Sequence, residues 1–202
     1  MDTSPSPPWM VRFAHLLSYV LHPAVLLLVT MGLLSATQQT SATVPIRDTL
    51  ILLAGLLPGL IYIVIQVRRG TVGHVHLLLK EERRVVLPLF LLGFVGSLGL
   101  YWLVGAAQFI VDGLLIGIIE GVILTLITRV WKISFHAAVS MTCAAFLLPS
   151  SPLLASLMAL LALITGLARL PIGHHTLAHV VAGWVFGFGV TTTLLATLTR
   201  YL

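Results

Sequence analysis

The sequence predicts an all-helical protein, a polytopic transmembrane bundle of about seven hydrophobic segments. Of its 202 residues, 58% are hydrophobic and only 8% are charged, and a soluble domain of this size cannot bury so much apolar surface. The apolar residues gather in long runs, and a helix needs roughly 20 such residues to cross the hydrocarbon of a bilayer. Charged and turn-forming residues stand between these runs, as they do between membrane spans.

The apolar runs follow one another along the chain, each bounded by charges or turn residues. They predict segments at 13–36, 48–67, 85–104, 107–128, 134–148, 152–168 and 176–198. We expect residues 13–202 to form a single membrane domain and residues 1–12 to form a flexible N-terminus. The opening MDTSPSPPW lacks a basic region and a small-residue cleavage site, so we expect no removable signal peptide.

The first and fourth segments contain ionisable side chains well inside the apolar run. His15 and His22 lie on one face of the first segment, where they are interpreted as packing residues. Asp112 and Glu120 lie in the fourth segment, where an unpaired charge costs several kcal/mol. We favour protonated or hydrogen-bonded packing between helices for this acidic pair, with a proton or substrate path as the alternative.

The last three segments differ in length. Segments 134–148 and 152–168 are short, and the tight turn PSSP at 149–152 joins them, which predicts a helical hairpin. The final segment follows a Pro/Gly turn and includes VVAGWVFG, whose small residues allow close packing between helices.

The basic residues are distributed unevenly between the two sides that seven crossings define. Nine of the eleven fall on the N-terminal side, and removing the five nearest the polar clusters leaves four against two. The positive-inside rule therefore predicts that the N-terminal side faces the cytoplasm, in the cell (inner) membrane. The nine are Arg12, Arg68, Arg69, Lys80, Arg83, Arg84, Arg129, Lys132 and Arg169, and the other two are Arg47 and Arg200.

The composition also excludes several kinds of partner and site. Eleven basic residues are too few and too scattered for a nucleic-acid surface. The single cysteine, Cys143, supports neither a disulfide framework nor a thiolate metal cluster. We expect membrane lipids as partners, predict no cofactor, and make no prediction of a protein partner.

Three polar clusters are predicted to meet at one membrane surface. Their sequences are HVHLLLKEERR at 74–84, RVWKISFH at 129–136 and ARLPIGHHTLAHVVAGWVFG at 168–187. All three fall on the N-terminal side of the predicted spans. Convergence of separate segments at one surface is what an active site requires, although a basic anchoring rim has the same arrangement.

The second cluster has the features of an anion site at the start of a helix. Ser134 is a good N-cap, and the first turn of a helix leaves backbone N–H groups without helical partners. Those donors and the helix dipole favour an anion such as phosphate. Lys132 adds positive charge, and His136 places a proton donor in the first turn. The alternative is a helix start at the membrane interface beside a snorkelling lysine.

The third cluster combines an arginine with three histidines, His174, His175 and His179. Arg169 ends one helix, and His175 and His179 lie four residues apart on one face of the next. An imidazole needs a partner on its second nitrogen to fix its tautomer, and His179 is placed to be that partner. Zinc binding and a purely structural cluster are the alternatives, although HTLAH lacks the glutamate of the HExxH zinc motif.

The first cluster is the least specific. Lys80 lies one turn from Arg83 and Arg84, an arrangement that suits either phosphate binding or a solvated interfacial face. Two histidines on separate helix starts, flanked by basic residues, together indicate phosphoryl chemistry. One imidazole would attack phosphorus, the other would protonate the leaving oxygen, and the basic groups would stabilise the equatorial oxygens.

At these residues the sequence resembles the type-2 phosphatidic acid phosphatase superfamily, the lipid phosphate phosphatases. The family pattern is K-x6-R-P, then P-S-G-H, then S-R-x5-H-x3-D. The chain has Lys80 and Pro88 of the first motif, ISFH at 133–136 for the second, and Arg169-x5-His175-x3-His179 for the third. The resemblance covers about 132–187, is weaker over 80–88 and is absent elsewhere.

The resemblance implies a metal-independent phosphohydrolase with a core in the C-terminal half. By this match His175 would form a phosphohistidine and His136 would be the general acid. Residues holding the phosphate would be Lys80, Ser134 and Arg169, with Arg83 or Arg84 in place of the family arginine. The substrate would be an amphiphilic phosphate ester such as a lipid phosphate, or an isoprenyl pyrophosphate.

Three departures from the family pattern leave other functions open. Leu87 stands where the family has arginine, the Pro and Gly of the second motif are missing, and His179 replaces the family aspartate. A catalytically degenerate member that binds lipids, or that serves as a structural subunit of a membrane complex, is the main alternative. A metal or haem site built from His136, His174, His175 and His179 is a third.

Overall fold

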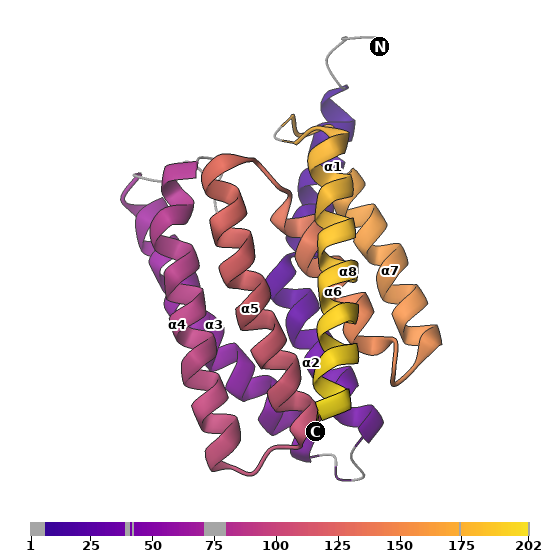
Figure 1. The fold of residues 1–202 in the computed structure, drawn as a ribbon. Helices are drawn as coiled ribbons and strands as arrows, with labels where there is room; N and C mark the ends of the chain where they lie inside the picture. The colour runs from indigo at the N-terminus through magenta and orange to yellow at the C-terminus, as the bar shows by residue number, and fades with distance from the viewer. Residues whose placement is uncertain (1–6, 39–40, 42, 71–79, 174, 202) are drawn as a thin grey trace. The chain divides into compact units, whose positions relative to one another are not determined.

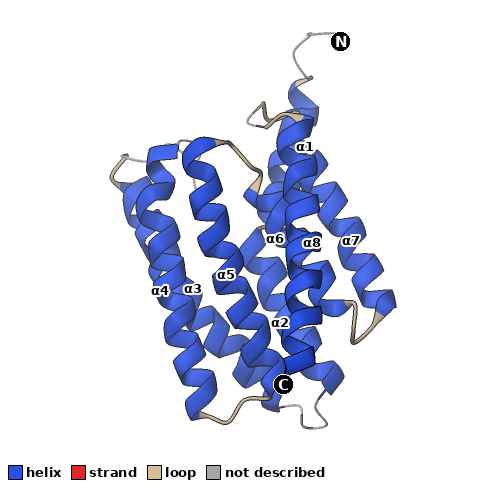
Figure 2. Cartoon of the chain, in the orientation of Figure 1, coloured by secondary structure: helices blue, strands red, loops and turns tan. Residues whose placement is uncertain are grey.

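The computed structural model describes residues 7–38, 41, 43–70, 80–173 and 175–201, with side chains at all of these except 80–84 and 199–201. Eight helices make up this part of the chain, and no strand occurs in it, so the all-helical prediction is confirmed (Figure 2). The helices are α1 (Pro8–Val20), α2 (Pro23–Gln38), α3 (Thr43–Arg68), α4 (Lys80–Leu103), α5 (Gln108–Val130), α6 (Phe135–Leu147), α7 (Pro152–Leu167) and α8 (Leu177–Tyr201).

Several of these helices have the length and composition of membrane spans. Among the described residues, four qualify individually, in α3, α4, α5 and α8, and the bent pair of α1 and α2 brings the number to five if it is one span. The shorter α6 and α7 have 13 and 16 residues, about 20 and 24 Å at 1.5 Å per residue. The protein is therefore a membrane protein with four to five long apolar helices.

The first predicted segment is divided in two. Its halves, α1 and α2, meet at an angle of 41°. Pro23 begins α2, and proline has no N–H to continue the hydrogen bonds of the preceding helix, while its ring disfavours helical backbone at the residue before it. The Nδ1 of His22 accepts the backbone N–H of Ala24 at 3.2 Å, which caps the start of α2.

The chain folds as two compact units, each described by itself. The first contains Met1–Leu27 and Lys132–Thr191, and the second contains Leu28–Trp131 and Thr192–Leu202. The first unit thus carries the second and third polar clusters from Lys132 onward. The prediction of a single domain over 13–202 stays a prediction.

In the second unit, α3 and α4 lie side by side (Figure 1). Their backbones approach most closely at Gly55 and Gly93, where an added Cβ on either residue would overlap the backbone of the other. The hydroxyl of Ser97 donates to the carbonyl of Ile51 at 2.9 Å. Small residues and hydroxyl-to-backbone hydrogen bonds are characteristic of helix pairs in membranes.

A buried carboxylate lies near the start of α3 in the same unit. Asp48 is 1% exposed, and its Oδ1 accepts from Nε and Nη2 of Arg47 at 3.0 and 2.8 Å. Its Oδ2 accepts from the hydroxyl of Ser35 on α2 at 2.7 Å. The cost of burying this charge is offset by pairing and hydrogen bonding, so Asp48 joins α2 to α3.

In the first unit, α6 and α7 form the predicted hairpin, and α8 packs against both (Figure 1). A Cβ on Gly183 would lie 2.7 Å from the carbonyl of Ser134, and one on Gly187 would overlap the carbonyl of Ala138. Only glycine therefore allows α8 to lie this close to α6. Trp184 of α8 donates from Nε1 to the carbonyl of Ala162 on α7 at 3.0 Å.

Candidate functional site

A backbone hydrogen bond brings two of the predicted motifs together. The N–H of Ser134, in the loop before α6, donates to the carbonyl of His179, in the first turn of α8, at 3.1 Å. The starts of α6 and α8 are therefore adjacent, although they are 45 residues apart in sequence. Because each helix start carries the positive end of its dipole, this junction favours a negatively charged ligand.

At the start of α6, Ser134 is the predicted N-cap, and the structure confirms this. Its hydroxyl accepts from the backbone N–H of Ala137 at 3.4 Å. A serine hydroxyl that accepts one hydrogen bond still has a proton to donate. His136 follows in the first turn and is 7% exposed, so its ring is held within the unit.

The end of α7 places an arginine in the interior of the same unit. Arg169 comes two residues after the last residue of α7 and is only 2% exposed. Its Nη1 donates to the hydroxyl of Ser18 on α1 at 3.1 Å. The chain then turns through Gly173, whose φ of 80° lies in the left-handed region that favours glycine.

His175 and His179 are in ring contact, but they do not lie on one helical face as predicted, because α8 begins at Leu177 and His175 precedes it. Their ring centroids are 5.9 Å apart, and the rings are nearly perpendicular at 83°. His175 is 8% exposed and comes just before α8. The arrangement is an edge-to-face contact between two imidazoles.

The Nδ1 atom of His179 accepts a hydrogen bond at the start of α8. It accepts the backbone N–H of Thr176 at 3.2 Å, while the hydroxyl of Thr176 accepts the N–H of His179 at 3.4 Å. This is the reciprocal pattern of a capping box, with histidine in place of glutamate or glutamine. A nitrogen that accepts an N–H carries no proton, so the neutral ring of His179 has its proton on Nε2.

Ser18, on α1, and His22, just after α1, also lie at this site. From the sequence, His22 is interpreted as a packing residue, and Ser18 is not identified. Ser18 binds Arg169, and the ring of His22 contacts the ring of His136 with centroids 5.6 Å apart and an angle of 86°. The available signal was their four-residue spacing within an otherwise apolar segment. Spacing alone does not show which distant residues such a face contacts.

The charge of this unit is positive around the site. Lys132 is half-buried and lies two residues before the N-cap Ser134. Within the described parts of the unit, residues 7–27 and 132–191, the sequence contains no Asp or Glu. The composition of the unit therefore favours an anionic ligand over a cationic one.

Four predicted residues fall outside this description. The side chains of Lys80, Arg83 and Arg84 are not among those described, and their helix, α4, belongs to the second unit. His174 also lies outside the described residues. Their participation in the site stays a prediction.

Other polar side chains lie away from these clusters in the parts of the chain that the structure describes. No group of three or more His, Cys, Asp or Glu side chains there is arranged to hold a metal ion. Asp112 is buried and accepts from Nε2 of Gln108 at 2.8 Å. Both residues belong to α5, so packing between helices through Asp112 stays a prediction. Glu120 is also buried.

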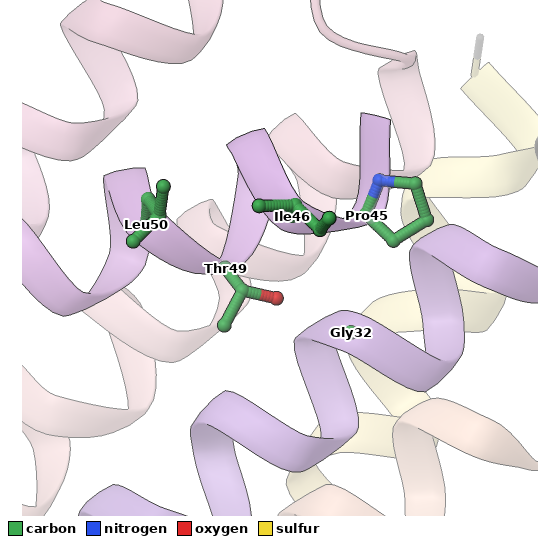
Figure 3. A pocket seen from close by; sticks show the side chains of 5 residues that line it. All are labelled: Gly32, Pro45, Ile46, Thr49 and Leu50. Atoms are coloured by element: carbon green, nitrogen blue, oxygen red, sulfur yellow. The ribbon is translucent and has the colours of Figure 1, made fainter. Parts of the chain in front are cut away.

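A hollow of about 310 Å³ lies elsewhere, in the second unit between α2 and α3 (Figure 3). Its lining is mostly apolar and contains none of the predicted site residues. It is formed by Gly32, Pro45, Ile46, Thr49 and Leu50.

No protein-family model, curated protein or solved structure matches the chain. The resemblance to lipid phosphate phosphatases therefore rests on the sequence motifs alone.

Proposed function

We propose that the protein is a membrane-embedded phosphohydrolase that acts on a lipid phosphate or an isoprenyl pyrophosphate through a phosphohistidine intermediate. The hydrogen bond from Ser134 to His179 is the observation that carries this proposal, because it joins the start of α6 to the start of α8. It brings two partial motifs of the lipid phosphate phosphatases into one compact unit. Buried His136, Arg169 and His175 of that unit supply the groups the chemistry needs.

The proposed reaction has two steps. A ring nitrogen of His175 attacks phosphorus, the bond from phosphorus to the ester oxygen breaks, and His136 gives its proton to that oxygen. Water then attacks the phosphohistidine, gives a proton to His136, and releases inorganic phosphate and the free imidazole. Arg169 and the N–H groups at the helix start would stabilise the negative charge that builds on the other phosphate oxygens.

The test is phosphate release from phosphatidate, phosphatidylglycerophosphate and isoprenyl pyrophosphates, with the full chain in detergent or liposomes. We expect His175→Asn to abolish release and His136→Ala to lower it by about 100-fold or more, since general acids contribute on the order of 10²–10⁴. His15→Asn on α1 is the matched control and should retain the wild-type rate. Release by the wild type that is no faster than in both site variants would overturn the proposal.

A second candidate function is binding without turnover, as a lipid-binding or structural subunit of a membrane complex. It is favoured by the use of His179 Nδ1 in the helix cap. A carboxylate at this position would stabilise positive charge developing on His175, whereas a neutral imidazole contributes less. Binding of inorganic phosphate without release of phosphate from any of these esters would support this candidate.

We also propose that all seven predicted segments lie within the bilayer, with α1 and α2 as one bent span. The short α6 and α7 would then form a hairpin in which the start of α6 and the end of α7 lie at the surface that carries the site. The distribution of basic residues supports a cytoplasmic position for that surface, in the cell (inner) membrane.

A further inference from the structure

The first helix brings two polar side chains to the candidate site. Ser18 lies near the end of α1, and His22 follows four residues later, before α2 begins. Ser18 is fully buried, and His22 is half-buried. Each contacts a residue that the proposed reaction uses: Ser18 contacts Arg169, and His22 contacts His136.

Ser18 holds the guanidinium group of Arg169. The hydrogen bond from Nη1 to the serine hydroxyl is 3.1 Å long and buried. Because the guanidinium is planar, fixing one corner also restricts the directions of its other N–H groups. A hydroxyl does this without bringing a negative charge, whereas a carboxylate would compete with an anionic ligand for the same guanidinium.

His22 presents a fixed ring to His136. Its own orientation is set by the backbone, because Nδ1 accepts the N–H of Ala24 at 3.2 Å. The two rings then meet edge to face, with centroids 5.6 Å apart.

The same arrangement occurs twice in this unit. In each pair a buried histidine, His136 or His175, contacts a histidine whose Nδ1 is held by a backbone N–H at a helix start. The anchored partners are His22 at α2 and His179 at α8. The structure thus gives each buried imidazole a neighbour that cannot rotate without breaking a helix cap.

We propose that Ser18 and His22 are positioning residues of the phosphate site, with Ser18 orienting Arg169 and His22 orienting His136. This inference rests on the proposed phosphohydrolase function. It makes the segment around the bend between α1 and α2 a part of the site. Binding of the phosphate group should depend on Ser18, and proton transfer should depend on His22.

Kinetics with the full chain test the two roles separately. Ser18→Ala is expected to raise KM by about 3- to 10-fold with a smaller change in kcat, and Ser18→Thr, which keeps the hydroxyl, is expected to restore KM. His22→Phe keeps a ring but not the nitrogen that caps α2, and it should lower kcat by about 10-fold with KM within twofold. Ser156→Ala and His15→Phe are the matched controls and should behave as wild type.

Histidine-selective ¹⁵N NMR in detergent supplies a measurement that does not need turnover. The His136 signal is assigned by its loss in His136→Ala. It should shift in His22→Phe but not in His15→Phe, and titration with inorganic phosphate should give a Kd about 3- to 10-fold weaker in Ser18→Ala than in Ser156→Ala.

The two measurements separate this inference from the proposed function. If the wild type releases no phosphate but the spectra change as expected, the positioning roles stand and the enzymatic function fails. Each residue is judged by its own variant. If that variant matches its control in both kinetics and NMR, the positioning role is overturned, whether or not the wild type is an enzyme.

Discussion

At the residue scale, His179 both stabilises the start of a helix and contacts a proposed catalytic residue. Its Nδ1 caps α8 by accepting the N–H of Thr176, while its ring contacts His175 edge to face. The lipid phosphate phosphatase motif has an aspartate at the position of His179. An aspartate at the third helical residue can also accept the N–H of Thr176. The helix cap therefore tolerates either residue, and the difference between them lies in the charge offered to His175.

His179→Asp should accordingly keep the fold and raise the rate of phosphate release. A carboxylate near a helix N-terminus is favourable by about 0.3–1 kcal/mol, and it stabilises positive charge on His175 during the reaction. We expect turnover to rise on the order of 10-fold, measured as phosphate released per folded protein. His179→Asn, which accepts the same N–H without a charge, is the control and should show no gain. Equal rates in the two variants would argue for a binding role.

At the element scale, the candidate site lies at the starts of α6 and α8 and just after the end of α7. The caps of α6 and α7 are both serines, Ser134 and Ser151, and they bond the backbone N–H groups of Ala137 and Leu154 at 3.4 and 3.3 Å. The two caps lie at the start of different helices of one hairpin. They are chemically alike, but only Ser134 lies at the junction with α8.

This likeness allows a test that separates folding from function. Ser134→Ala and Ser151→Ala should each lower the free energy of unfolding by about 1 kcal/mol, because each removes one N-cap. Only Ser134→Ala should also reduce phosphate release, or phosphate affinity, per folded protein. Unfolding in mixed detergent micelles and the activity assay give the two values. A loss of activity that is equal in both variants would place Ser134 among the purely structural residues.

The helices of the site were predictable from sequence to the extent that local rules govern them. The pattern before residue 135 predicted the N-cap Ser134, and the spacing of His175 and His179 predicted their contact. The break before Pro23 was missed because the run 13–36 is apolar enough as a whole to predict one span, although it contains His22 and Pro23. The contacts of Ser18 and His22 were missed as well, because they depend on how α1 packs against residues more than 100 positions away.

At the scale of the whole molecule, composition predicted the membrane class and the all-helical fold. A chain that is 58% hydrophobic must place its apolar side chains in lipid, and the described helices expose many large apolar residues, including Leu153, Leu160 and Val185. The number of spans was harder to predict, because hydropathy alone does not distinguish a full crossing from the short helices α6 and α7. The orientation in the membrane is predicted only from the distribution of the Lys and Arg residues.

The orientation can be tested at the two ends of one span. Val104 lies just before α5, and Val130 is the last residue of α5. They are 43% and 83% exposed, whereas the native Cys143 is fully buried. If the basic residues set the topology, Val104→Cys should react with a membrane-impermeant maleimide in intact spheroplasts, and Val130→Cys should react only after lysis. The topology predicted from the sequence puts the proposed site on the same side of the membrane as Val130, so the opposite labelling pattern would place it outside the cytoplasm. In that case the basic residues on the Val130 side could not be explained by the positive-inside rule, which requires that side to be cytoplasmic. Anion binding at the site would explain them instead, because it does not depend on which side is cytoplasmic.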